Sequence, residues 1–198
     1  KFTVFSDYIG PFCYSGDARL NHLRRACALK VNWCYLELHP ETSPEGEPIA
    51  SLKYPSDTWQ RMMAALAQMA EEEHLSFLEH DFTTNSRSAL RLAEAAKYTD
   101  AGVFYHLHAR LFETFFSEGK NIGDRDILRR LGVEAGLSEQ QVEDAWRDAA
   151  VDKRLQQYAA AAHELNVRAT PTFFVGDQLL DGAVPAAQLT RAAAAALR

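Results

Sequence analysis

Cysteine is scarce in this sequence. The three cysteines, Cys13, Cys27 and Cys34, are too few and too scattered for a framework of disulfides. This scarcity argues against a disulfide-stabilised secreted domain and favours a protein of a reducing cytoplasm. The chain starts at Lys1 with neither an initiator methionine nor a signal-peptide pattern, so we expect a trimmed or cleaved N-terminus and a cytoplasmic location.

Excess positive charge and long apolar runs are also lacking. Acidic residues outnumber lysine and arginine by 27 to 21, and the net charge of −6 provides no attraction for nucleic acid or an anionic membrane. No run of about 18 apolar residues occurs, so no membrane-spanning helix is predicted. The seven histidines do not combine with cysteine or carboxylate at metal-ligand spacing, and no metal site is predicted. The composition is that of a soluble globular protein.

The stretch from Ser6 to Gly16 is the strongest candidate for a functional site. An alternating apolar run before it predicts a strand, and apolar residues spaced by three and four after it predict a helix. At the junction, Gly10 suits the N-cap and Pro11 suits the first helical position. Cys13 would then lie in the first helical turn, where the helix dipole and unpaired backbone N–H groups favour a thiolate.

The rest of the pattern places helices inside a strand-containing framework. Residues 31–38 predict a second strand, parallel to the first because a helix connects the two. Residues 57–163 carry six amphipathic helical stripes. A hairpin is expected at residues 172–181, turning at Gly176-Asp177, with a helix after it. The order β-α-β, helices, β-β-α is the α/β thioredoxin fold with an all-helical insertion.

This order also predicts domain boundaries. We expect a thioredoxin domain in two parts, residues 1–52 and 165–198, and a helical insertion domain at residues 53–164. The insertion contains an aromatic stripe that we expect to pack its core, with a role in walling an apolar cleft as the alternative; it consists of Phe104, Phe112, Phe115 and Phe116. Cys27 and Cys34 are predicted to be core residues, and Glu71 to Glu73 a solvated helix face.

Four segments, at residues 5–16, 36–46, 85–136 and 169–182, resemble a known family. On these segments the chain resembles the DsbA-like thioredoxin family, in particular its cytoplasmic oxidoreductases, whose relatives are 2-hydroxychromene-2-carboxylate isomerases and kappa-class glutathione transferases. The oxidoreductases carry Cys-Pro-x-Cys at the start of the first helix, whereas this chain has Gly10-Pro11-Phe12-Cys13. Gly10 therefore replaces the attacking cysteine, and Cys13 corresponds to the resolving one.

The resemblance also implies the other site residues. Pro171 matches the cis-proline of the family, and the backbone of Thr170 is implied to pair with an extended peptide or glutathione. Cys13 is the only candidate catalytic residue, with a buried apolar role as its alternative. The predicted substrate-binding residues are Gly10, Pro11, Phe12, Tyr14, Thr170 and Pro171, of which Phe12 and Tyr14 are equally suited to packing.

Three functions are compatible with these residues. The leading hypothesis is a thiol-disulfide oxidoreductase-like protein that acts as a monothiol through Cys13 and lacks full dithiol oxidase activity, because that activity needs two thiols. The alternatives are a glutathione-dependent isomerase-like or transferase-like enzyme and a non-catalytic binding module that uses the cis-proline groove. The expected partners are protein or small-molecule thiols or disulfides, with glutathione as a possible co-substrate and no resident cofactor. The oligomeric state is left open.

Overall fold

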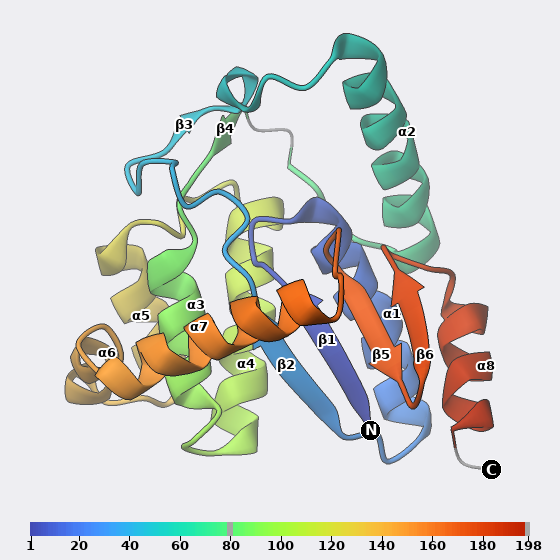
Figure 1. Ribbon diagram of the computed structural model, residues 1–198. Coiled ribbons are helices and arrows are strands. Elements are labelled where there is room, and N and C mark those ends of the chain that lie inside the picture. The colour runs from blue at the N-terminus through green and yellow to red at the C-terminus, as the bar shows by residue number, and fades with distance from the viewer. Residues whose placement is uncertain (79–80, 197–198) are drawn as a thin grey trace.

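A four-stranded mixed sheet forms the centre of the computed structural model, which describes residues 1–78 and 81–196 (Figure 1). Strand β1 (Phe2–Ser6) lies between β2 (Val31–Tyr35), to which it is parallel, and β5 (Thr172–Val175), to which it is antiparallel. Strand β6 (Gln178–Asp181) pairs antiparallel with β5. The predicted thioredoxin order is confirmed, although β2 ends at Tyr35, three residues earlier than expected.

Helices cover both faces of this sheet. Helix α1 (Pro11–Ala26) packs against α8 (Ala186–Ala195) on one side, and α7 (Ala149–Glu164) crosses the opposite side over β1 and β2 (Figure 1). Apolar residues under α7 make a small cluster around Phe5, Cys34 and Ala162. The prediction that Cys34 is a core residue is confirmed.

The inserted segment begins after β2. It contains a 3₁₀ turn (Ile49–Leu52), α2 (Ser56–Glu73), α3 (Arg87–Ala96), α4 (Ala101–Phe112), a π-helical turn (Glu113–Ser117), α5 (Arg125–Ala135) and α6 (Glu139–Ala145). It also holds a two-residue ladder between β3 (Glu47–Pro48) and β4 (Phe82–Thr83), a detail that differs from an all-helical insertion. Helix α2 packs on α1, away from the group formed by α3 to α7 (Figure 1).

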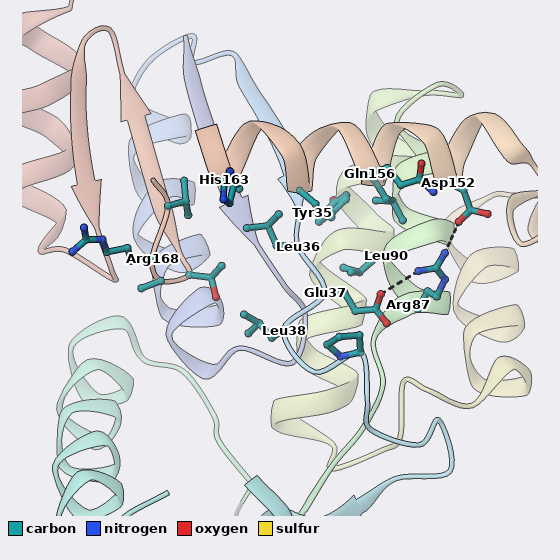
Figure 2. Close-up of a pocket in the computed structure, with 17 residues that line it drawn as sticks. Tyr35, Leu36, Glu37, Leu38, Arg87, Leu90, Asp152, Gln156, His163 and Arg168 are labelled. Carbon is teal, nitrogen blue, oxygen red and sulfur yellow. Dashed lines mark hydrogen bonds and ion pairs between the residues drawn. The ribbon is translucent and has the colours of Figure 1, made fainter. Parts of the chain in front are cut away.

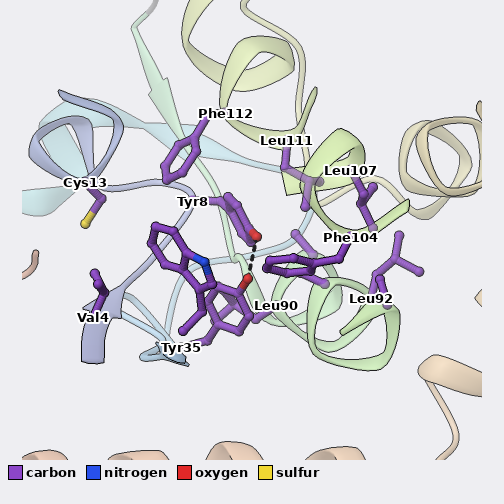
Figure 3. Packing of buried hydrophobic residues seen from close by; sticks show 14 of the residues in the cluster. Val4, Tyr8, Cys13, Tyr35, Leu90, Leu92, Phe104, Leu107, Leu111 and Phe112 are labelled. Carbon is purple, nitrogen blue, oxygen red and sulfur yellow. Dashed lines mark hydrogen bonds between the residues drawn. The ribbon is translucent and has the colours of Figure 1, made fainter. Parts of the chain in front are cut away.

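One buried core runs through the sheet, α1 and helices α3 to α5 (Figure 3). The four residues of the predicted aromatic stripe are all buried in it, as expected: Phe104, Phe112, Phe115 and Phe116. The core is continuous across the expected domain boundaries and does not mark them. The boundaries therefore stay a prediction.

Two packing predictions are wrong. Cys27 is exposed because α1 ends at Ala26 and Cys27, in an extended conformation, caps the helix. Glu71 and Glu72 are exposed as expected, but the side chain of Glu73 is only 7% exposed, and its carboxylate accepts a hydrogen bond from the Nε of Arg19, 2.8 Å away. Arg19 is itself buried and also pairs with Glu72, so this arginine ties α2 to α1.

Candidate active site at the start of helix α1

The turn before α1 has the predicted capping arrangement. Gly10 is the N-cap in an extended conformation, and Pro11 occupies the first helical turn, where the missing N–H costs nothing. The Gly10 N–H donates to the carbonyl of Asp7 over 3.3 Å, and the Cys13 N–H donates to the carbonyl of Gly10 over 3.0 Å. These bonds place Cys13 one helical turn after Gly10.

Cys13 is almost fully buried, with 1% of its surface exposed, and its sulfur lies at one side of the core (Figure 3). Burial raises the pKa of its thiol to about 11, although hydrogen bonds from the Thr170 side chain, the Asp7 backbone and the Ser6 side chain oppose this rise. The expectation that the helix start favours a thiolate is therefore wrong for Cys13. Desolvation outweighs the helix dipole there.

Gly10 has no side chain, and a side chain at this position would point at Cys13. A Cβ atom built on Gly10 would lie 2.8 Å from the Cys13 sulfur and 3.4 Å from Cδ1 of Leu38. In a disulfide, the Cβ of one cysteine lies about 3 Å from the sulfur of the other, given the S–S bond length. The turn therefore has the geometry of a Cys-x-x-Cys pair without its first side chain.

The Thr170–Pro171 loop lies against α1, and its peptide bond is cis, the isomer that the resemblance implied. Gly16 permits this approach, because a Cβ there would meet Cγ of Pro171 at 2.9 Å. Pro171 is buried, whereas Thr170 is partly exposed. Within the described residues, neither the backbone N–H nor the C=O of Thr170 has a hydrogen-bond partner. Thr170 can therefore bind a ligand through its backbone.

A large apolar cavity, of about 940 Å³, opens over this turn. Four of the predicted substrate-binding residues line it: Gly10, Pro11, Phe12 and Thr170. Helix α2 and the π-helical turn supply much of the remaining wall, including Phe115 and Phe116, so the aromatic stripe both packs the core and walls a cleft. This volume lies within the range of small-molecule sites.

Tyr14 does not line this cavity. Its ring stacks on Phe112 and Phe116, at interplanar angles of 17° and 10°, and its hydroxyl lies 3.1 Å from Oγ of Ser117. Tyr14 therefore has the packing role that was the alternative for it.

A second cavity, of about 580 Å³, lies between α7, the segment after β2 and the start of α3 (Figure 2). It shares Leu38 and Thr170 with the first cavity, so these two residues form a ridge between the cavities. Arg87 lies at its side and pairs with Glu37 at 3.2 Å and Asp152 at 2.9 Å (Figure 2). A ligand that spans Thr170 would therefore have room on both sides.

Asp7 is a site residue that sequence reasoning missed. Its buried carboxylate accepts hydrogen bonds from the Leu38 N–H at 2.8 Å and the Ser86 hydroxyl at 2.9 Å. Burial raises the pKa of Asp7 to about 7, against these hydrogen bonds. An acidic residue directly after an apolar strand was the signal in the sequence. Through these two hydrogen bonds Asp7 joins the turn before α1 to Leu38 on the ridge and to Ser86 at the start of α3.

A second missed group is a buried chain of hydrogen bonds behind the turn. The Tyr8 hydroxyl lies 2.8 Å from the Tyr35 hydroxyl (Figure 3). It also lies 2.7 Å from Nδ1 of His108, and Nε2 of His108 lies 3.1 Å from Asp17. All four side chains are buried. Because α4 carries His108 and α1 carries Asp17, these hydrogen bonds fix α4 against the start of α1.

Neither a metal site nor a membrane span is found in the described part of the chain. Residues 1–78 and 81–196 contain no group of three histidine, cysteine or acidic side chains that could hold a metal ion. No helix in the same ranges is long and apolar enough to cross a membrane.

Comparison with known proteins identifies the family. The model of the DSBA-like thioredoxin domain matches residues 2–194. The chain belongs to the DsbA-like thioredoxin family. It is also 30% identical over 185 residues to YwbO, an uncharacterized protein of Bacillus subtilis (strain 168). These residues make up 91% of this chain and 88% of YwbO.

Solved structures of other DsbA-like proteins share its fold. A probable DsbA oxidoreductase from Streptomyces coelicolor, SCO1869, is 25% identical with a TM-score of 0.84, over 99% of this chain and 89% of that one. The cytosolic disulfide reductase DsbM from Pseudomonas aeruginosa, solved with GSH, is 19% identical with a TM-score of 0.70, over 98% and 94% of the two chains. The chain is thus a DsbA-like member of a thioredoxin-fold oxidoreductase family.

The buried carboxyl of Asp7 predicts a pH dependence of stability. Because its pKa rises from 3.8 to about 7 on folding, its contribution to stability is fully present below pH 4 and is lost as the pH rises to 7. We expect Asp7→Asn to remove this loss, since an amide does not ionise and its oxygen, in the place of Oδ2, can accept the bonds from both Leu38 and Ser86. Urea unfolding at pH 4.5 and 7.5 measures the difference. Asp57→Asn, at an exposed carboxylate, is the control and should keep the wild-type profile.

Proposed function

We propose that this protein binds peptide-like thiols and disulfides of the glutathione class at the start of α1 and does not exchange disulfides through Cys13. The observation that carries this proposal is the large cavity over Gly10 beside a thiol that is 1% exposed. Such a site has room for a ligand but no accessible nucleophile. This function is the alternative of a non-catalytic binding module, in a member of an oxidoreductase family.

The protonation state of Cys13 supports this function. With a pKa of about 11, only about one thiol in 10,000 is ionised at pH 7, and the thiolate is the attacking species in disulfide exchange. Neither Cys27 nor Cys34 stands near the turn, since one caps the far end of α1 and the other lies under α7. A dithiol reaction at this turn therefore has no second partner.

The ligand class follows from the ridge between the two cavities. The free N–H and C=O of Thr170 suit an extended backbone, and space continues on both sides of Thr170 and Leu38. A sulfur-bearing residue centred on the ridge would lie over Gly10. The DsbM structure solved with GSH is consistent with glutathione as the test ligand.

The monothiol reaction is the second candidate, and one observation favours it. The Cys13 sulfur lies toward the open position at Gly10, where a side-chain atom would approach it to 2.8 Å. A small disulfide that entered this space would meet the sulfur directly.

Labelling with a thiol reagent separates these two functions. In the native protein at pH 7.5 we expect rapid reaction of the exposed Cys27 and no reaction of Cys13 or Cys34, because both are buried. The Cys27→Ser variant should then remain unlabelled until denaturant is added. Rapid native labelling of this variant, abolished by a further Cys13→Ser change, would support the monothiol reaction.

A second thiol at position 10 should restore dithiol chemistry. We expect Gly10→Cys to form a disulfide with Cys13 and to reduce insulin in the presence of a thiol reductant, with no catalysis by the wild type. Gly10→Ser is the matched control, since it adds a similar volume without sulfur. If the wild type reduces insulin and Cys13→Ser keeps this activity, the role assigned to this turn is wrong.

Calorimetric titration with reduced glutathione tests binding itself. We expect saturable binding by the wild type and a loss of about tenfold or more in Gly10→Leu, whose side chain would fill the space beside Cys13 and Leu38. Ala160→Leu adds the same side chain to the exposed face of α7 and should bind like the wild type. The absence of wild-type binding at millimolar ligand would disprove the proposed function.

A further inference from the structure

The lining of the larger cavity is unusually aromatic. Seven of the 23 lining residues that the structure describes are aromatic, about three times the 11% of the whole chain. They come from several segments, with Tyr54 and Trp59 on the α2 side, Phe77 after α2, and Phe115 and Phe116 in the π-helical turn. Several separate segments therefore place rings around one space.

The π-helical turn directs two consecutive rings into this wall. The N–H of Glu118 donates to the carbonyl of Glu113, five residues earlier, over 2.9 Å. Phe115 and Phe116 both line the cavity, with ring centroids 4.9 Å apart. Phe77 approaches Phe116 to 5.5 Å between centroids. Single π-helical turns occur frequently at functional sites, and here the turn widens the aromatic wall.

The opposite wall, on α2, is adaptable. Trp59 is partly exposed and lies beside Tyr54, with 6.1 Å between ring centroids. Met62 and Met63 line the same side, and methionine packs readily against rings of varied shape. These residues can close on a planar group that enters between α2 and the π-helical turn.

The charges in the cavity determine which part of a ligand it can take. None of its described lining residues is lysine or arginine. Besides Tyr54 and Trp59, the polar side chains among them are His39, Asp81, Thr83 and Thr170. The two carboxylates of a glutathione-like molecule would meet no lysine or arginine among these residues. Beyond the ridge, the smaller cavity is lined by Arg87 and Arg168. Arg87 is paired with Glu37 and Asp152, so Arg168 is the arginine of this lining that has no carboxylate partner in the described part of the chain. The peptide part therefore belongs at the ridge and beyond it, which leaves the larger cavity to the group attached to sulfur.

We propose that the ligand carries an aromatic group on its sulfur and that this ring occupies the space between Trp59 on α2 and Phe116 in the π-helical turn. The ligand class is an S-arylmethyl conjugate of glutathione or a closely similar aromatic thioether. This inference rests on the proposed binding of glutathione-class ligands over Gly10. It assigns the specificity of that site to the aromatic wall and involves no covalent step with the protein.

The test compares two thioethers with the same carbon count. S-benzylglutathione and S-(cyclohexylmethyl)glutathione differ in aromaticity, so their affinity ratio isolates ring stacking from simple burial. We expect S-benzylglutathione to bind about 2- to 12-fold more tightly in calorimetric titrations. Both should bind more tightly than S-methylglutathione, because they bury more apolar surface.

Two variants place the preference in this cavity. Trp59→Leu should reduce the benzyl-to-cyclohexylmethyl affinity ratio to about one, whereas Tyr98→Leu, at an exposed ring outside the cavity, should keep the wild-type ratio. Trp59 is the only one of the three tryptophans that lines the cavity, so S-benzylglutathione should change the wild-type fluorescence and leave that of Trp59→Leu unchanged.

The outcomes distinguish this inference from the function on which it rests. If no glutathione compound binds the wild type, the proposed function itself fails. If the two bulky thioethers bind with equal affinity, or if Trp59→Leu keeps the preference for the benzyl compound, the aromatic specificity is wrong while glutathione-class binding stands.

Discussion

The candidate site depends on one buried carboxylate. Asp7 directly follows the strand that leads into the turn, and its Oδ2 accepts hydrogen bonds from both the Leu38 N–H and the Ser86 hydroxyl. Three segments that are distant in sequence thus meet at one side chain. Leu38 is held where it contacts the Gly10 position and separates the two cavities. The burial that makes this junction specific also raises the pKa of Asp7, so the same interaction that shapes the site carries an electrostatic cost.

The chemistry of Cys13 results from two opposed effects at the same turn. A helix N-terminus stabilises an anion by up to about 1 kcal/mol near the surface. The rise of the Cys13 pKa from 9.0 to about 11 corresponds to roughly 3 kcal/mol against the thiolate. Position at the first helical turn is therefore insufficient for reactivity, and access to solvent decides the outcome. In the family's Cys-Pro-x-Cys turn the exposed first cysteine has that access, and here Gly10 has no thiol to expose.

The sequence was sufficient for the features that depend on local pattern. The cap at Gly10 and Pro11 and the hairpin after Pro171 follow from residue type and spacing, and the structure has both. Properties set by contacts between distant segments could not be read in the same way. The position of Asp7 beside Leu38 is one example. The exposure of Cys27 is another example, because it depends on helix α1 ending at Ala26, one residue before Cys27. The cavity required α2 to pack on α1 through Arg19 and Glu73, residues whose pairing no periodicity indicates.

The loss of the first thiol and the aromatic cavity belong to one arrangement. A thioether ligand carries a substituent on its sulfur, and this substituent needs space near the α1 N-terminus that a side chain at position 10 would occupy. Gly10 has no side chain and lines the cavity, which extends to the rings of α2 and the π-helical turn. A thioether has no S–S bond to exchange, so a protein that binds one needs no attacking cysteine. On the proposed function, the glycine that leaves a single thiol at this turn also suits a site for sulfur conjugates.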